Sequence, residues 1–163
     1  MQLITLLLLF TSCGVAGRTG VPAAGQEATL SRSSLSASIS TEEIQNQLQA
    51  AYADWEGTPY QLGGSGPDGV DCSSFMQIVL SDYFDVMLPR NTREQIRVGQ
   101  GVRRGAIRPG DLIFFRTTRR DLHVGIALSG DDFLHASVSS GVMVSGLDEH
   151  YWSSRFLGVR RVL

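Results

Sequence analysis

The order of helix-like and strand-like segments constrains the fold of this chain more than any other feature of its sequence. Apolar residues recur at helical spacing in the first half, between residues 41 and 55 and again between 71 and 83. The second half consists of short β-rich runs bounded by Gly, Ser and Asp. These runs are Leu112–Phe115, His123–Leu128, Phe133–Ala136, Val142–Val144 and Phe156–Val159. Helices followed by strands predict an α+β domain, with helices packed on an antiparallel sheet, rather than a doubly wound fold.

Capping residues predict where the helices begin and end. A hydroxyl cap at Thr41, followed by acidic residues, begins the first helix, and Gly57 ends it. Asp71 is a good N-cap for the second helix, which places Cys72 in its first turn. A third, shorter helix is expected from Asn91 to Val98.

The N-terminal region predicts an exported, lipid-anchored chain. Residues 3–10 form an apolar run of signal-peptide length, too short to span a bilayer. Small residues then precede Cys13, an arrangement that resembles the lipobox of exported lipoproteins. We therefore expect a signal peptide at 1–12, a lipidated Cys13 with a flexible linker at 13–40, and one domain at 41–163. An ordinary cleaved signal or a buried apolar strand is the alternative.

The charge of the chain narrows the classes of partner. The 163 residues carry a net charge of −2, which gives no electrostatic case for nucleic acid. All 14 basic residues are Arg. Because Arg binds carboxylates in a bidentate manner, this composition would suit an acidic substrate, but genomic codon bias is the favoured explanation.

Cys72 is the candidate nucleophile, because lipidation of Cys13 would leave it the only free thiol. A thiol attacks as its thiolate, and a free cysteine with a pKa of about 8.5 is mostly protonated at neutral pH. A helix N-terminus contributes only about 0.3–1 kcal/mol, and the Asp71 carboxylate opposes it. A histidine partner is therefore needed, and His123 and His135 are the candidates. The alternative is an inert buried cysteine with structural histidines; His150, in a polar turn, is assigned no role.

Several motifs at these positions resemble the NlpC-type cell-wall peptidases, a papain-like branch of the cysteine hydrolases. The motifs are Asp71–Phe75, Arg108–Phe115, His123–Ile126 and Phe133–Ser137, in the family's order. Within that family the chain looks closest to the outer-membrane lipoprotein murein endopeptidases of Gram-negative bacteria. The resemblance implies a papain-like fold, with Cys72 as nucleophile, His123 as general base and His135 as the residue that orients it. Tyr60 matches a tyrosine that could help to hold the oxyanion, or it packs beside Pro59.

The resemblance also implies a substrate and a location. The expected reaction is hydrolysis of a peptidoglycan stem peptide, first the D-alanyl–meso-diaminopimelate cross-link and second the D-glutamyl–meso-diaminopimelate bond. Arg90, Arg93 or Arg116 could contact the substrate carboxylates. No cofactor or metal is implied, and we expect a monomer, anchored by lipid in the cell envelope and facing the periplasm, with the outer membrane as its site.

Three other functions remain open on the sequence alone. One Cys and two His residues can hold zinc with an open position. The family usually has Gly where this chain has Ser74, and a side chain there would either narrow the cleft or only add a hydroxyl to the helix turn. A narrowed cleft would change the substrate specificity. Ser74 is also the only sequence support for a non-catalytic peptidoglycan-binding lipoprotein that keeps the cleft but has lost turnover. An amidase or acyltransferase of the same fold is the third alternative, because the fold does not determine the acceptor.

Overall fold

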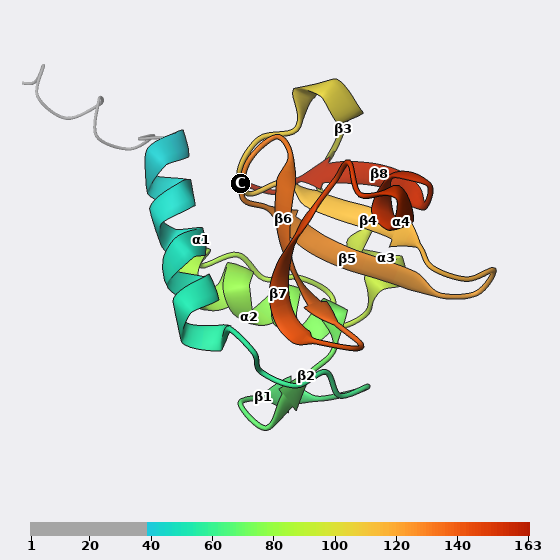
Figure 1. Ribbon diagram of the computed structural model, residues 1–163. Coiled ribbons are helices and arrows are strands. Elements are labelled where there is room, and N and C mark those ends of the chain that lie inside the picture. Colours follow the sequence, from blue (N-terminus) through green and yellow to red (C-terminus); the bar gives the residue numbers. More distant parts are fainter. Residues whose placement is uncertain (1–38) are drawn as a thin grey trace, which may run out of the picture. The chain divides into compact units, whose positions relative to one another are not determined.

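The computed structural model describes residues 39–163, so the predictions for the signal peptide, Cys13 and nearly all of the linker lie outside the described residues. The three helices α1, α2 and α3 precede all strands of the main sheet, and α4 lies just before the last of these strands (Figure 1). The helices are α1 (Thr41–Trp55), α2 (Cys72–Phe84), α3 (Thr92–Gln95), the 3₁₀ helix η1 (Arg104–Ala106) and α4 (His150–Ser153). The strands are β1 (Ser65–Gly66), β2 (Gly69–Val70), β3 (Gln100–Val102), β4 (Leu112–Arg116), β5 (Leu122–Ala127), β6 (Asp132–Ser137), β7 (Gly141–Gly146) and β8 (Phe156–Arg161).

The strands form a two-stranded hairpin, β1-β2, and a six-stranded antiparallel sheet in the order β3-β8-β4-β5-β6-β7. All five β-rich runs predicted from the sequence are strands of the larger sheet. The prediction of an α+β domain with helices packed on an antiparallel sheet is therefore confirmed. No helix within residues 39–163 has the length and apolar character needed to cross a membrane.

Both faces of the sheet are buried at its centre, which explains the continuous apolar run of β4. Successive side chains of a strand point to opposite faces. Leu112 and Phe114 therefore join one core with α1 and α2, which lie to one side of the sheet (Figure 1). Ile113 and Phe115 join a second core on the other face, which includes Trp152 of α4.

Two predicted helix boundaries were wrong by a few residues. The N-cap of α1 is Ser40 rather than Thr41, because Ser40 has extended backbone geometry and its hydroxyl accepts a hydrogen bond from the N–H of Glu43 (3.1 Å). Helix α3, expected from Asn91 to Val98, has Asn91 as its N-cap and ends at Gln95. The chain then turns, and Gly99 at φ +67° packs so closely on β8 that a Cβ would lie 2.2 Å from the carbonyl oxygen of Arg161.

The turn before β4 is held by a buried ion pair. Asp111 is 1% exposed, and its carboxylate accepts hydrogen bonds from Nε and Nη2 of Arg161, both at 2.8 Å. The same carboxylate accepts from the N–H of Arg108 at 2.9 Å, so it closes the predicted turn and ties it to β8.

Candidate active site

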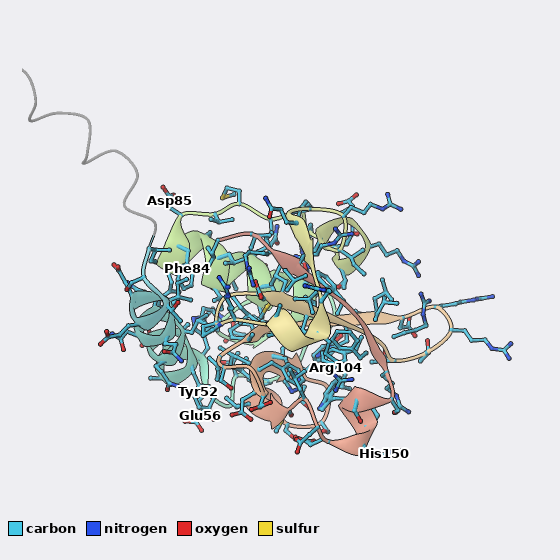
Figure 2. All side chains as sticks on the ribbon, turned by 90° about the horizontal axis from the view of Figure 1, so that it is seen from above. Tyr52, Glu56, Phe84, Asp85, Arg104 and His150 are labelled. Atoms are coloured by element: carbon cyan, nitrogen blue, oxygen red, sulfur yellow. The ribbon has the colours of Figure 1, made fainter. Side chains whose placement is uncertain are left out.

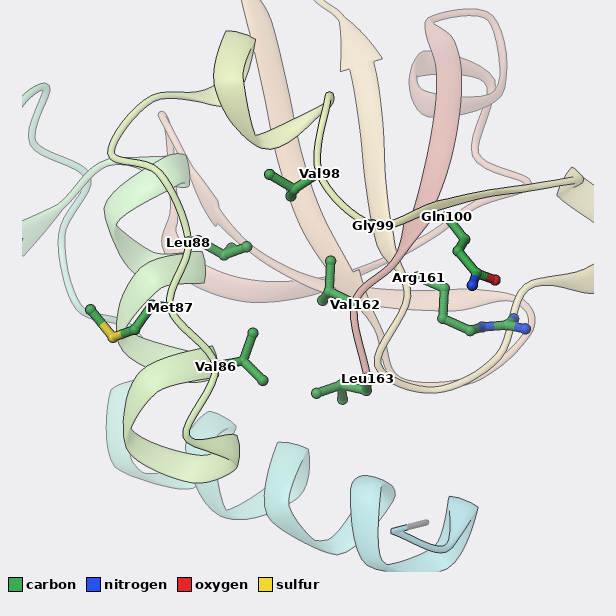
Figure 3. A pocket seen from close by; sticks show the side chains of 9 residues that line it. All are labelled: Val86, Met87, Leu88, Val98, Gly99, Gln100, Arg161, Val162 and Leu163. Atoms are coloured by element: carbon green, nitrogen blue, oxygen red, sulfur yellow. The ribbon is translucent and has the colours of Figure 1, made fainter. Parts of the chain in front are cut away.

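The four predicted site residues of the domain line one cleft of about 1200 Å³. Cys72, His123 and His135 are buried at its floor, and Tyr60 is half-buried beside them. His150 is exposed at the start of α4 (Figure 2) and does not line the cleft, in agreement with its having no assigned role. A second cavity of about 410 Å³ lies between the segment after α2 and the end of β8 (Figure 3), and it contains none of the predicted site residues.

The position of Cys72 is set by the N-cap of α2. The Asp71 carboxylate accepts hydrogen bonds from the N–H of Ser74 (2.8 Å), the hydroxyl of Ser73 (2.9 Å) and the N–H of Gly63 (3.0 Å). Arg90 adds two more, at 3.0 and 2.8 Å. Burial alone would raise the pKa of Asp71, but the hydrogen bonds from Arg90, Ser74 and Ser73 outweigh it and lower the pKa to about 2.

The Cys72 thiol is not activated by its helix. Burial raises its pKa, the neighbouring Asp71 charge adds to that, and the Thr92 hydroxyl and the N–H of Val124 only partly offset them. This agrees with the expectation that a helix N-terminus alone is too weak to generate a thiolate. The N–H of Cys72 donates none of the hydrogen bonds found among residues 39–163, as expected for a residue in the first helical turn.

His123 and His135 form one hydrogen-bonded chain that ends at a serine. Nε2 of His123 lies 3.0 Å from Nδ1 of His135, and Nε2 of His135 lies 3.0 Å from Oγ of Ser145. Ser145 and His135 are diagonal neighbours on the β6-β7 hairpin, which places them on the same face. Burial lowers the pKa of His123 to about 4, and burial together with the charge of His123 lowers that of His135 to about 3, so both rings are neutral at pH 7.

Aromatic side chains enclose the two imidazoles. Trp152 stacks on His123, with ring centroids 5.2 Å apart, and presents an edge-to-face contact to His135 at 4.9 Å. Phe133 stacks on the other side of His135 at 4.8 Å. Sequence reasoning missed Ser145 and Trp152, because their positions in a β-run and a short polar helix carry no signal of a contact with distant histidines.

A glycine makes room for the histidine pair. A Cβ on Gly125 would lie 2.6 Å from Cδ2 of Phe133, 2.8 Å from the carbonyl oxygen of Leu134 and 3.1 Å from Cβ of His135. Strands β5 and β6 pair only at Ile126–Leu134 and Ala127–Phe133, and the ladder stops short of His123.

The structure does not join Cys72 to His123 directly. The Cys72 Sγ makes a hydrogen bond with Oγ1 of Thr92, at 3.7 Å, and none between Sγ and the His123 ring is found among the described residues. The nucleophile–base pair therefore stays a prediction, supported by the shared cleft. Tyr60 makes an isolated parallel bridge to Val70, and burial, followed by the effect of Cys72, raises the pKa of its hydroxyl, which remains a donor at neutral pH.

Ser74 faces away from the cleft. It is 1% exposed, its Oγ accepts from the N–H of Asp71 at 3.0 Å, and its hydroxyl contacts the carbonyl oxygen of Gly64 at 2.6 Å. The Ser74 side chain therefore adds a hydroxyl to the first turn of α2 and does not narrow the cleft. It completes a capping box with Asp71 and ties the residue that precedes β1, Gly64, to α2.

Of the three arginines expected to contact substrate carboxylates, Arg90 and Arg93 line the cleft and Arg116 does not. Arg90 lines the cleft but is engaged with Asp71, and Arg116 is exposed and does not line it. Arg93 does line it and donates to the carbonyl oxygen of Arg120, in the loop between β4 and β5. Arg120, which sequence reasoning did not single out, lines the same end of the cleft. No group of three or more His, Cys, Asp or Glu side chains within residues 39–163 is arranged to hold a metal ion.

Comparison with known proteins confirms the resemblance drawn from the sequence. The NlpC/P60 family model matches residues 57–161. The murein DD-endopeptidase MepS/murein LD-carboxypeptidase of Escherichia coli K12 is 44% identical over 121 residues, 74% of this chain and 64% of that protein. A probable endopeptidase of Haemophilus influenzae is 50% identical over 111 residues, 67% of this chain and 69% of that protein. The chain thus spans just under two thirds of the length of the Escherichia coli relative.

Solved structures agree with this assignment and with the papain-like fold. A lipoprotein-like NLP/P60 family protein of Staphylococcus aureus superposes with a TM-score of 0.65 at 35% identity, over 75% of this chain and 42% of that one. The NlpC/P60 domain of the peptidoglycan hydrolase SagA superposes with a TM-score of 0.62 at 25% identity, over 76% of this chain and all of that domain.

The Arg90–Asp71 contact predicts a pH-dependent loss of stability. The folded pKa of Asp71, about 2, lies below its ordinary value of 3.8, so the stabilisation is complete above about pH 4 and is lost as pH falls through 2. We expect Arg90→Gln to lower the free energy of unfolding by about 1–2 kcal/mol at pH 7, allowing for the exposure of Arg90.

Urea unfolding at pH 7 and at steps down to about pH 2.5 measures the difference in free energy of unfolding between wild type and Arg90→Gln. This difference is expected to become smaller as Asp71 becomes protonated. The matched control is Arg97→Gln, because Arg97 is exposed and its side chain donates no hydrogen bond among those described. A difference between wild type and Arg90→Gln that stayed constant with pH would contradict the role given to Asp71.

Proposed function

The chain belongs to the NlpC/P60 family of cysteine peptidases, and we propose that it hydrolyses amide bonds of peptidoglycan stem peptides, first of all the D-alanyl–meso-diaminopimelate cross-link. The observation that carries this proposal is the meeting, in one cleft, of Cys72 at a capped helix start with the His123–His135–Ser145 chain. The name of the Escherichia coli relative, a murein DD-endopeptidase, supports the choice of bond.

The proposed mechanism is acyl transfer through a thioester. His123 takes the proton of the Cys72 thiol as Sγ attacks the carbonyl carbon, and the carbonyl electron pair moves onto oxygen. The unpaired N–H of Cys72 and the Tyr60 hydroxyl donate to this oxyanion. His123 then protonates the leaving amine, and the C–N bond breaks to give the acyl-enzyme. In the second half of the reaction, His123 accepts a proton from a water molecule as that water attacks the thioester carbonyl. The C–S bond then breaks, which releases the carboxylic acid product and returns the Cys72 thiol.

His135 and Ser145 act in this scheme through His123. Because both imidazoles are buried and neutral, one nitrogen of their contact donates and the other accepts. An N–H on Nε2 of His123 that donates to His135 leaves Nδ1 of His123 as the proton acceptor for the thiol. His135 then donates from Nε2 to Ser145, which holds both rings in these tautomers.

A second candidate bond is the D-glutamyl–meso-diaminopimelate bond within one stem. A gamma-DL-glutamyl hydrolase of Bacillus subtilis is 40% identical over 108 residues, although these make up 26% of that protein, and this similarity supports the alternative. The alternative of a non-catalytic peptidoglycan-binding lipoprotein was based on Ser74. Because Ser74 does not narrow the cleft, the structure gives no support for that alternative.

Location forms part of the same proposal. Cys13 follows an apolar run and a pair of small residues, and we infer that it carries lipid and anchors the domain to the outer membrane, facing the periplasm. The Staphylococcus aureus protein of similar structure is described as similar to lipoprotein, which supports an anchor. Mass spectrometry of the detergent-extracted chain would detect an acylated Cys13 at the mature N-terminus; an intact N-terminus or a cut elsewhere would refute the anchor.

The first prediction on function concerns Cys72. Incubation of the full chain with purified sacculi, followed by mass spectrometry of the muropeptides, is expected to show loss of cross-linked dimers and a matching gain of monomers. Cys72→Ala is expected to show neither change, because it lacks the nucleophile. The matched control is Cys13→Ser in detergent, which removes the other cysteine and retains Cys72.

Each other outcome of that experiment has a distinct meaning. Trimmed stems with intact cross-links would move the scissile bond to the second candidate. An active Cys72→Ala variant would contradict the thiol mechanism, and sacculi unchanged by wild type would favour the binding-only alternative.

The second prediction concerns Arg120, which lines the cleft and is exposed. If it meets a diaminopimelate carboxylate at the rim, Arg120→Gln raises KM about two- to fivefold and leaves kcat unchanged, as expected for loss of an exposed ion pair. The control is Arg119→Gln, which alters the neighbouring exposed arginine outside the cleft lining. The effect is expected to vanish on a substrate whose diaminopimelate is amidated; an equal effect on both substrates would exclude the contact.

A further inference from the structure

We propose that Thr92 is a positioning residue for Cys72: its hydroxyl donates a hydrogen bond to Sγ and stabilises the thiolate. The inference rests on the proposed function of Cys72 as nucleophile. It adds to the predicted Cys–His–His site a residue from a different helix, which neither the capping pattern nor the motifs singled out.

The contact is largely buried beside the cleft, and the Thr92 hydroxyl has no competing partner among the described hydrogen bonds. Oγ1 of Thr92 lies 3.7 Å from Sγ of Cys72, a distance suited to hydrogen bonds with the larger sulfur atom. The two residues are 8% and 7% exposed, respectively. Among the described hydrogen bonds, Oγ1 of Thr92 takes part in this one alone. Since a thiolate can only accept, the hydroxyl must donate to it once the thiol has lost its proton.

The surrounding structure holds Thr92 in place. Thr92 is the first residue of α3, whose N-cap is Asn91, with Oδ1 accepting from the N–H of Glu94 at 3.1 Å. Gln95 is fully buried, and its Nε2 donates to the carbonyl oxygens of Ser73 (3.0 Å) and Pro89 (2.8 Å). The first of these bonds joins α3 to the residue that follows the nucleophile, so Thr92 is fixed relative to Cys72.

The electrostatic environment of Cys72 explains why a hydrogen-bond donor to its sulfur matters. Burial and the Asp71 charge both raise the pKa of Cys72, and of the groups that lower it the Thr92 hydroxyl has the largest effect, ahead of the N–H of Val124. The titratable or charged groups around the thiol are Asp71 with its partner Arg90, Tyr60 of the preceding loop and His123 of β5. A substitution at Thr92 leaves all of them unchanged.

An opposite role for the same contact is conceivable on geometry. By holding Sγ, Thr92 would keep it from His123 and suppress its reactivity. The two roles predict opposite signs: loss of the hydroxyl slows the reaction of the thiol if it stabilises the thiolate, and speeds it if it restrains the sulfur.

The test measures thiol reactivity without any peptidoglycan. In a full-length Cys13→Ser background, Cys72 is the sole cysteine, and its rate of alkylation by iodoacetamide is followed from about pH 5 to 10. We expect Thr92→Val, which is close in shape but has no hydroxyl, to shift the alkylation profile to higher pH. At pH 7 the rate should fall about three- to tenfold, the result of a pKa higher by half a unit to one unit. Thr92→Ser should restore the wild-type profile.

Two controls separate this effect from loosening of α3. Asn91→Ala removes the cap of the same helix but leaves the Gln95 bonds that fix Thr92 relative to Cys72, so it is expected to lower the melting temperature without moving the alkylation profile. Circular dichroism establishes that each variant is folded, and Thr92→Ala provides a second hydroxyl-free variant should Thr92→Val unfold. Titration of the thiolate by its ultraviolet absorbance gives the pKa independently of alkylation.

An unchanged or faster reaction of folded Thr92→Val would overturn the inference, and so would a failure of Thr92→Ser to restore the profile. Failure of the proposed function is a separate observation. If wild type leaves sacculi uncut while the alkylation profile of Thr92→Val shifts as expected, the inference about Thr92 is supported and the proposed substrate is refuted.

Discussion

The Asp71 carboxylate is the contact on which the rest of the site depends. It caps α2, and through its five hydrogen bonds it brings together the loop at Gly63, the helix start and Arg90. Cys72 is aimed into the cleft because the residue before it is held in this way. The same negative charge opposes formation of a thiolate, so the fold that positions Cys72, the predicted nucleophile, also favours its protonated form. Activation then depends on neutral donors and on a base delivered by the sheet.

The sheet positions His123, the predicted base, in an environment that excludes water and keeps its imidazole neutral. Trp152, Phe133 and the strand packing exclude water from His123 and His135, and burial keeps both uncharged at neutral pH. The resting site is therefore a thiol facing neutral imidazoles rather than a preformed ion pair. Proton transfer in the proposed mechanism accompanies attack on the substrate, which limits side reactions of the thiol when the cleft is empty.

Much of the fold was predictable because local physics determines it. The Asp71 cap, the start of α2 and the strands of the central sheet all follow from capping chemistry and β-rich runs, and they place Cys72, His123 and His135. Strand β3 was missed because its residues, Gln100–Val102, are short, partly exposed and without apolar alternation. Ser145, Trp152 and Arg120 were missed for another reason: their roles arise from tertiary contacts with residues distant in the sequence, which periodicity does not encode.

The layout of the β6-β7 hairpin bears on how such a domain can change over evolutionary time. His135 and Ser145 lie on paired strands whose register runs unbroken from Asp132–Gly146 to Ser137–Gly141, while the tip, with Val138, Ser139 and Ser140, projects into the wall of the cleft. Insertions or exchanges at the tip reshape that wall without shifting the register that aligns the two relay residues. Under the proposed mechanism, the contact with substrate and the His135–Ser145 hydrogen bond thus belong to separate parts of one hairpin, so the tip can vary while the paired strands keep these two residues aligned.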